Sequence, residues 1–243
     1  MKEAGKVQWA LEKLDFEADL QQAKVLRTES QRVLLNCTRQ WGKSTVTAIK
    51  ALHHAQHTPG SLTLVVSPSA RQSRELVRKV EGFMRRLGMR PKGDGGNTIS
   101  VRFPNGSRIV GLPANEATVR GFSAVSLLVI DESARVPDDL YRALRPMLAV
   151  SGGALWLMST PFGKRGFFYE AWTKGGPVWE RVSVPARDCP RIAPEFLEEE
   201  RATMGERWFR QEYECEFRDD VANVFDRDLV EAAFRDDVKP LDL

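Results

Sequence analysis

Cysteine is scarce in this sequence, which holds three in 243 residues: Cys37, Cys189 and Cys215, with no CxxC pair. An odd number of widely spaced cysteines excludes a disulfide framework and argues against a zinc site. Long hydrophobic runs are also missing, and the longest, such as 125–130, fall far short of the ~20 residues that a membrane span requires. The charged N-terminus lacks the apolar stretch of a signal peptide. We therefore expect an intracellular protein with no membrane role.

Low-complexity segments and internal repeats are absent as well. Hydrophobic residues make up 42% of the chain and charged residues 28%, a balance that supports a packed core. At ~100–200 residues per domain, the length predicts one large domain with at most a small appendage. The net charge of +3 is unevenly distributed, because residues 1–110 hold 19 Lys and Arg against 9 Asp and Glu, whereas residues 111–243 hold 17 against 24. The N-terminal half therefore carries the charge that attracts a polyanion.

Short β-rich runs alternate along the sequence with longer amphipathic segments. Strands are expected at 33–35, 62–66, 127–130 and 154–158, and helices at 43–57, 70–87, 138–149 and 166–172. The Asn105-Gly106 turn predicts a hairpin between 97 and 112. This order is typical of an α/β domain with a mostly parallel sheet. Two acidic helices, expected at 194–203 and 206–213, are interpreted as a small lid.

The strongest motif is a phosphate-binding loop at 37–45, Cys-Thr-Arg-Gln-Trp-Gly-Lys-Ser-Thr, which follows a predicted strand and opens a predicted helix. In such a loop, backbone N–H groups hold the phosphates, Lys43 places a charge on the β- and γ-oxygens, and the Ser44 hydroxyl can bind Mg²⁺. Arg39 adds a second cation. Cys37 replaces the first glycine of the GxxxxGK[ST] pattern, so its backbone must adopt a conformation that a side chain tolerates.

Two carboxylates, Asp131 and Glu132, end the predicted strand 127–130 at the edge where open α/β sheets bind ligands. We assign Asp131 to the metal and Glu132 to the attacking water, since phosphoryl transfer needs both tasks. Strand alternation is expected to place the two side chains on opposite sides. A third strand ends in Ser159-Thr160-Pro161, whose hydroxyls can sense the γ-phosphate.

These motifs, in this order, resemble the ATPase domain of the large terminase subunit, the DNA-packaging motor of tailed bacteriophages. The resemblance covers nearly the whole chain, from Gln22 through the loop and the segments 120–123 and 128–133 to 159–166 and 208–213. It implies a P-loop NTPase fold of the ASCE type, with a mostly parallel central sheet flanked by helices and a small C-terminal lid subdomain. The expected boundaries are an ATPase core at 1–184, including an adenine-side segment at 1–31, and a lid with the start of a linker at 185–243.

The resemblance also implies the site residues. ATP is expected to contact Gln22, Thr38, Arg39, Gln40, Gly42, Lys43, Ser44 and Thr45, although Leu20 and Gln21 replace the aromatic residue and the proline expected beside that glutamine. Mg²⁺ is expected at Ser44 and Asp131. Catalysis is expected from Lys43, Glu132, Thr160 and Arg120. The last corresponds to an arginine finger that reaches the neighbouring subunit, and such fingers can contribute ~10³–10⁵ in rate.

The implied partners are double-stranded DNA, further copies of the chain in a ring (a pentamer on the portal), the portal protein and the small terminase subunit, at the procapsid in the host cytoplasm. The predicted helix 70–87 supports DNA binding, because Arg71, Arg74, Arg78 and Arg85 share a face opposite its apolar residues. We select Arg85, Arg86 and Arg90 as candidate DNA contacts. Related terminases also carry a nuclease domain resembling RNase H, which is absent from these residues because the tail with Asp226, Asp228, Asp236 and Asp237 is too short to form it.

Two other functions remain open from the residues. A helicase-like DNA-dependent ATPase shares the loop, the acidic pair and the Ser-Thr-Pro turn, but normally needs a second motor domain. A non-hydrolysing DNA-binding scaffold is disfavoured by the intact Lys43, Ser44, Asp131 and Glu132. A nucleotide kinase is weaker still, because no arginine-rich closing segment is evident.

Overall fold

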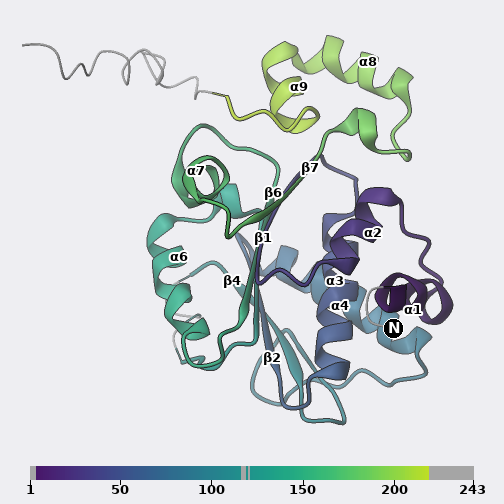
Figure 1. Ribbon diagram of the computed structural model, residues 1–243, viewed down its shortest axis with the longest axis vertical. Helices are drawn as coiled ribbons and strands as arrows, with labels where there is room; N and C mark the ends of the chain where they lie inside the picture. Colours follow the sequence, from purple (N-terminus) through teal and green to yellow (C-terminus); the bar gives the residue numbers. More distant parts are fainter. Residues whose placement is uncertain (1–3, 116–118, 120, 219–243) are drawn as a thin grey trace, which may run out of the picture.

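A seven-stranded sheet forms the centre of the protein in the computed structural model, which describes residues 4–115, 119 and 121–218 (Figure 1). Its strands are β1 (Arg32–Cys37), β2 (Leu62–Ser67), β3 (Ser100–Arg102), β4 (Arg108–Pro113), β5 (Leu127–Asp131), β6 (Ala154–Ser159) and β7 (Glu180–Val184). They lie in the order β3-β4-β2-β5-β6-β1-β7. All neighbours pair in parallel except β3 and β4, which form the predicted hairpin. The α/β fold with a mostly parallel sheet is thus confirmed.

Helices cover both faces of the sheet (Figure 1). One face carries α1 (Ala4–Leu14), α2 (Leu20–Arg27), α3 (Lys43–His57) and α4 (Ala70–Arg86), and the other carries α6 (Asp138–Leu144) and α7 (Gly166–Lys174). Helices α8 (Pro194–Met204) and α9 (Glu206–Glu212) lie beyond the carboxyl ends of the strands, at the top of Figure 1. No helix within the described ranges is both long and apolar enough to cross a membrane.

Two hydrophobic cores lie on opposite faces of the sheet because side chains alternate along each strand. In β1, Val33 and Leu35 join the core under α1 to α4, whereas Leu34 joins the core under α6 and α7. Trp156 of β6 and Phe168 of α7 are among the largest fully buried side chains, one in each core. Each buried leucine or valine contributes ~1.5–3 kcal/mol relative to exposure. The continuous apolar strands therefore fix the sheet between two helical layers.

Most predicted helices agree with the structure, and the exceptions have local causes. The predicted helix 138–149 is shorter: α6 ends at Leu144 and a 3₁₀ turn, Arg145–Leu148, follows. Pro146 lacks the backbone N–H that would continue α6. Helix α2 begins at a capping box in which Asp19 accepts from the backbone of Gln22 and the Gln22 side chain accepts from Asp19. Helices α1 and α2 and strand β7 were not predicted.

Candidate nucleotide-binding site

The carboxyl ends of three adjacent strands bring the predicted motifs together. Strand β6 lies between β1 and β5, and Asn36 is paired with Ser159 while Asp131 is paired with Met158. The loop after β1, the hydroxyl residues at the end of β6 and the acidic pair after β5 therefore meet at one edge. This order, with an added strand between the loop strand and the acidic strand, is that of the ASCE type.

The phosphate loop has the backbone that its sequence requires. Gln40 (φ 62°) and Gly42 (φ 102°) are left-handed, whereas Cys37 is the last residue of β1, paired in parallel with Val184 of β7. A side chain is tolerated at Cys37 because this position is extended strand, which explains the missing glycine. Trp41 is fully buried in the core beneath α1 to α4 and anchors the loop.

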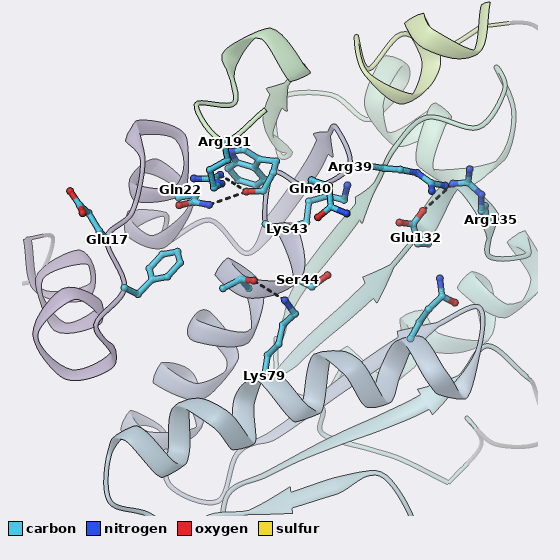
Figure 2. Close-up of a pocket in the computed structure, with 15 residues that line it drawn as sticks. Glu17, Gln22, Arg39, Gln40, Lys43, Ser44, Lys79, Glu132, Arg135 and Arg191 are labelled. Carbon is cyan, nitrogen blue, oxygen red and sulfur yellow. Dashed lines mark hydrogen bonds and ion pairs between the residues drawn. The ribbon is translucent and has the colours of Figure 1, made fainter. Parts of the chain in front are cut away.

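A cavity of about 630 Å³ opens over this loop (Figure 2). Lys43 is 7% exposed, and its ammonium donates to the carbonyl oxygens of Cys37 at 2.7 Å and Thr38 at 3.1 Å. The lining combines the loop with residues from five other segments: Phe16, Glu17, Gln22, Arg39, Gln40, Trp41, Gly42, Lys43, Ser44, Thr45, Gln72, Lys79, Glu132, Arg135 and Arg191. Basic groups predominate in it, so the cavity suits an anion with several negative charges.

Gln22 supports the loop from the side of α2. Its Nε2 donates to the Trp41 carbonyl at 3.0 Å, and the guanidinium of Arg191 donates to the same oxygen at 2.5 Å and to Asp19 at 2.9 Å. A Cβ at Gly42 would lie 3.0 Å from the Gln22 amide nitrogen. Gln22 is 3% exposed, so its amide holds the loop in shape. Its contact with adenine stays a prediction.

Asp131 and Glu132 occupy different environments. Asp131 is 7% exposed, and burial, together with the nearby Glu132, raises the pKa of its carboxyl to about 7. Glu132 lines the cavity, and its left-handed backbone (φ 49°, ψ 43°) leaves the strand. A backbone turn, and not the strand alternation that we expected, therefore separates the two carboxylates.

The Ser159 and Thr160 hydroxyls are fully buried behind the cavity. Ser159 Oγ accepts from the Ala134 N–H at 3.3 Å, and Thr160 Oγ1 accepts from Arg135 at 3.3 Å. Both contacts lead to the 3₁₀ turn Ser133–Arg135 that follows the acidic pair. Strand β6 is thus linked to the segment that carries Glu132.

Five charged residues of the site were not predicted from sequence: Glu17, Lys79, Arg135 and Arg191 line the cavity, and Glu212 pairs with two of its arginines. Arg135 donates to Glu132 at 3.0 Å (Figure 2), and Glu212 of α9 accepts from Arg39 at 2.7 Å and from Arg135 at 3.1 Å. Lys79 of α4 donates to Thr45 at 2.9 Å, and Arg191 is described above. Arg135 lies one helical turn after Glu132, which is a usable signal. Nothing in the sequence relates Glu212 to the loop.

Some predicted residues lie elsewhere. Thr38, Asp131 and Thr160 do not line the cavity, and Thr38 Oγ1 donates to the Glu212 carbonyl at 3.1 Å. Arg120 lies outside the described residues.

The candidate DNA contacts are remote from the cavity. Helix α4 runs from the carboxyl edge back toward the amino edge, so Arg85, Arg86 and Arg90 are exposed at its far end. Arg85 pairs with Glu81 at 3.5 Å. Arg86 donates to the Leu14 carbonyl and so joins α4 to α1. Arg86 thus has a contact within the fold that accounts for its position.

The donor groups near Lys43 fit a magnesium ion. Mg²⁺ prefers oxygen ligands and usually takes one or two carboxylates together with substrate phosphates. The Ser44 hydroxyl and the buried Asp131 carboxylate are such oxygens, and burial of that carboxylate is compensated when a cation binds beside it. The described part of the chain holds no cluster of three or more His, Cys, Asp or Glu side chains that could hold a metal ion.

Residues 34–232 match the family model "Terminase large subunit, T4likevirus-type, N-terminal". The chain belongs to this terminase family. The large terminase subunit of Escherichia phage T5 is 27% identical to it over 175 residues, which are 69% of this chain and 40% of that protein. The chain therefore spans less than half the length of this relative.

Solved terminase structures share the fold. The large terminase ATPase domain of Thermus phage P74-26 matches 90% of this chain and 100% of its own length, with a TM-score of 0.76 and 23% identity. A large terminase from a thermophilic bacteriophage, solved in complex with ADP, matches 82% of this chain and 54% of its own length, with a TM-score of 0.71 and 13% identity. The fold is thus that of a terminase ATPase domain.

Proposed function

We propose that this terminase domain hydrolyses ATP and that the energy drives double-stranded DNA into a procapsid. The observation that carries the proposal is the meeting of Lys43, Ser44 and Glu132 around one cavity, with Asp131 buried beside them. The family match supports the motor role, and the solved relative with bound ADP supports a nucleotide as ligand.

The residues divide the chemistry between them. Backbone N–H groups of the loop, Lys43 and Arg39 hold the phosphate oxygens, and Gly42 allows the close approach of the backbone. Ser44 and Asp131 would hold Mg²⁺, which would supply neutralisation of phosphate charge. Glu132 orients the attacking water and accepts its proton.

The partners follow from the same proposal. Arg120 acts on the nucleotide of a neighbouring copy, so the motor works as a homo-oligomeric ring, a pentamer on the portal, supplied with DNA by the small terminase subunit in the host cytoplasm. Thr160 passes the loss of the γ-phosphate to neighbouring segments, which its contact with Arg135 supports.

Hydrolysis across protein concentration tests the catalytic part. We expect the rate per subunit to rise with concentration, Glu132→Gln and Arg120→Ala each to lose ~10²-fold or more, and a mixture of the two variants to recover activity. Recovery is expected because one subunit supplies the carboxylate and its neighbour the arginine. A wild-type protein that binds no ATP contradicts the proposal.

DNA affinity tests the translocation part. The double variant Arg85→Ala/Arg90→Ala is expected to weaken binding to duplexes of any sequence and to reduce the salt slope by ~1 per lost phosphate contact. Basal hydrolysis is expected to stay unchanged. Arg142→Ala, an exposed arginine of α6, is the matched control. If the double variant binds DNA with unchanged affinity, the proposal that Arg85 and Arg90 contact DNA is wrong.

A further inference from the structure

A chain of ion pairs connects the catalytic carboxylate to α9. Arg135 donates through one nitrogen to Glu132 at 3.0 Å and to Thr160 at 3.3 Å, and through the other to Glu212 at 3.1 Å. Its guanidinium also lies 4.7 Å from the centre of the Phe162 ring. Four neighbours from three segments therefore fix the plane of this side chain.

Glu212 is held as firmly as Arg135. It is 8% exposed, its second carboxylate oxygen accepts from Arg39 at 2.7 Å, and its backbone carbonyl accepts from Thr38 at 3.1 Å. A buried carboxylate between two guanidinium groups forms strong, directional contacts. The end of α9 is thus fastened to the phosphate loop and to Arg135 at once.

The contact between Arg135 and Glu132 leaves chemistry possible. It engages the Oε2 atom of Glu132, and a carboxylate has a second oxygen that can accept a hydrogen bond from water. When a hydrogen bond holds one oxygen of a catalytic carboxylate, the other oxygen keeps a fixed direction toward the proton that it accepts, as in other sites where a third group orients the base. Without such a partner, a glutamate side chain at this left-handed position would sample several rotamers instead.

We propose that Arg135 is a positioning residue for Glu132 and that Glu212 sets the place of Arg135, so that α9 controls the orientation of the catalytic carboxylate. The inference rests on the proposed function, because that function gives Glu132 its role. It assigns to α9 an effect on the rate of hydrolysis and not on nucleotide affinity.

Steady-state kinetics with MgATP test the role of Arg135. Arg135→Met is expected to lower kcat ~10–100-fold, as loss of an orienting partner commonly does, and to leave KM within about 3-fold of the wild type. Arg135→Lys is expected to recover part of kcat, because a lysine keeps the charge but cannot bridge several partners in one plane. The control Arg142→Met breaks an exposed pair with the same sequence spacing on α6, with Asp139 at 2.8 Å, and is expected to match the wild type.

Glu212→Gln tests the link to α9. We expect a smaller loss of kcat, about 3–10-fold, and we expect the double variant with Arg135→Met to be no slower than Arg135→Met alone, since Glu212 acts through Arg135. Glu214→Gln is the control, because Glu214 pairs with Arg201 at 2.7 Å and not with the site. Additive losses in the double variant, or a rise in KM alone, overturn the part played by Glu212.

The outcomes separate the two proposals. If the wild type hydrolyses no ATP, or Glu132→Gln hydrolyses it normally, the proposed function fails. If both behave as expected while Arg135→Met keeps or raises kcat, the positioning role alone is wrong. A comparable loss of kcat and of ATP affinity in Arg135→Met also overturns it, because that pattern means that Arg135, which lines the cavity, binds the nucleotide itself and does not act only through Glu132.

Discussion

Helix α3 has one cavity at its N-terminus and a second beside its C-terminal half, and the buried groups with shifted pKa values differ between them. At its N-terminus, Asp131 is the buried group with the raised pKa. At its C-terminus, a cavity of about 250 Å³ is lined by Lys6, Lys50 and the three histidines, with Glu29. There burial and the nearby Lys6 lower the pKa of Lys50 to about 7, and burial and His57 lower the pKa of His53 to about 4.

The two ends differ in how their charges are arranged. Near the N-terminus of α3, basic side chains lie between carboxylates that come from the end of β5 and from α9. The basic residues are Lys43, Arg39 and Arg135. In the second cavity, Lys50 and His53 lie among other basic groups, while the Glu29 carboxylate in its lining pairs with Lys6 at 2.5 Å. Buried titratable groups alone therefore do not mark the catalytic end. What distinguishes the N-terminal cavity is a connected set of ion pairs beside the phosphate loop, in which Glu132 and Glu212 pair with Arg135 and Glu212 also pairs with Arg39.

The largest contrast is expected between the two lysines of α3. Lys43→Met is expected to lower ATP hydrolysis ~10²-fold or more, because it removes a fixed cation from the site of developing charge. Lys50→Met, in the middle of α3 and in the lining of the second cavity, is expected to leave hydrolysis within about 2-fold, since nothing there contacts phosphate in the proposed mechanism. Steady-state rates of both purified variants measure the contrast. Equal losses would mean that the amino edge also takes part in catalysis.

The second-largest contrast between the two cavities is expected in how the stability of the protein changes with pH. The pKa of Asp131 is higher in the folded protein than its ordinary value of 3.8. Between about pH 4 and pH 7 the folded state therefore keeps a proton that the unfolded state has released, and the free energy of unfolding falls as pH rises through this range. Asp131→Asn is expected to remove that loss. The melting temperature of Asp131→Asn minus that of the wild type, both measured without Mg²⁺, should therefore increase by on the order of 5 °C from pH 5 to pH 8. Asp139→Asn, an exposed aspartate of α6, should show no such change.

The opposite change of stability with pH is expected at the second cavity, which Lys50 lines. The pKa of Lys50 is lower than its ordinary value of 10.5, so its charged form is penalised in the folded state and stability rises as pH increases from about 7 to 10. Lys50→Met should flatten this rise. At pH 7 the free energy of unfolding of Lys50→Met is expected to exceed that of the wild type by only ~1–2 kcal/mol. The gain is limited because the variant loses the hydrogen bond to the Thr28 carbonyl, at 2.6 Å. Urea unfolding at pH 7 and pH 9.5 measures the effect, with the exposed Lys174→Met as control.

The phosphate-loop side of this contrast could largely be predicted from sequence, because local patterns carry it, whereas the cavity lined by Lys6 and Lys50 was not predicted. The apolar runs of β1, β5 and β6 and the loop signature place Lys43, Asp131 and Glu132 at one edge of a parallel sheet. The pairing of Arg135 with Glu212 could not be predicted, since 77 positions separate them and α9 has no periodic signal that says where it packs. Strand β7 was missed because Arg181 and Ser183 interrupt its apolar residues at the sheet edge.

The smallest effect is expected at His53. Its ring stacks on His57 with centroids 4.0 Å apart and meets Trp9 edge-on at 5.0 Å. Because burial and His57 lower its pKa to about 4, the folded state disfavours the protonated ring, and stability is lost as pH falls from about 6.5 toward 4. His53→Phe keeps a neutral ring in the stack, so we expect no change at pH 7 and a gain below ~1 kcal/mol at pH 5, reduced by the partial exposure of the site. Denaturant unfolding at the two pH values measures it. A loss of ATP hydrolysis in this variant would break the comparison, because it would connect the amino edge to the chemistry at the other end of α3.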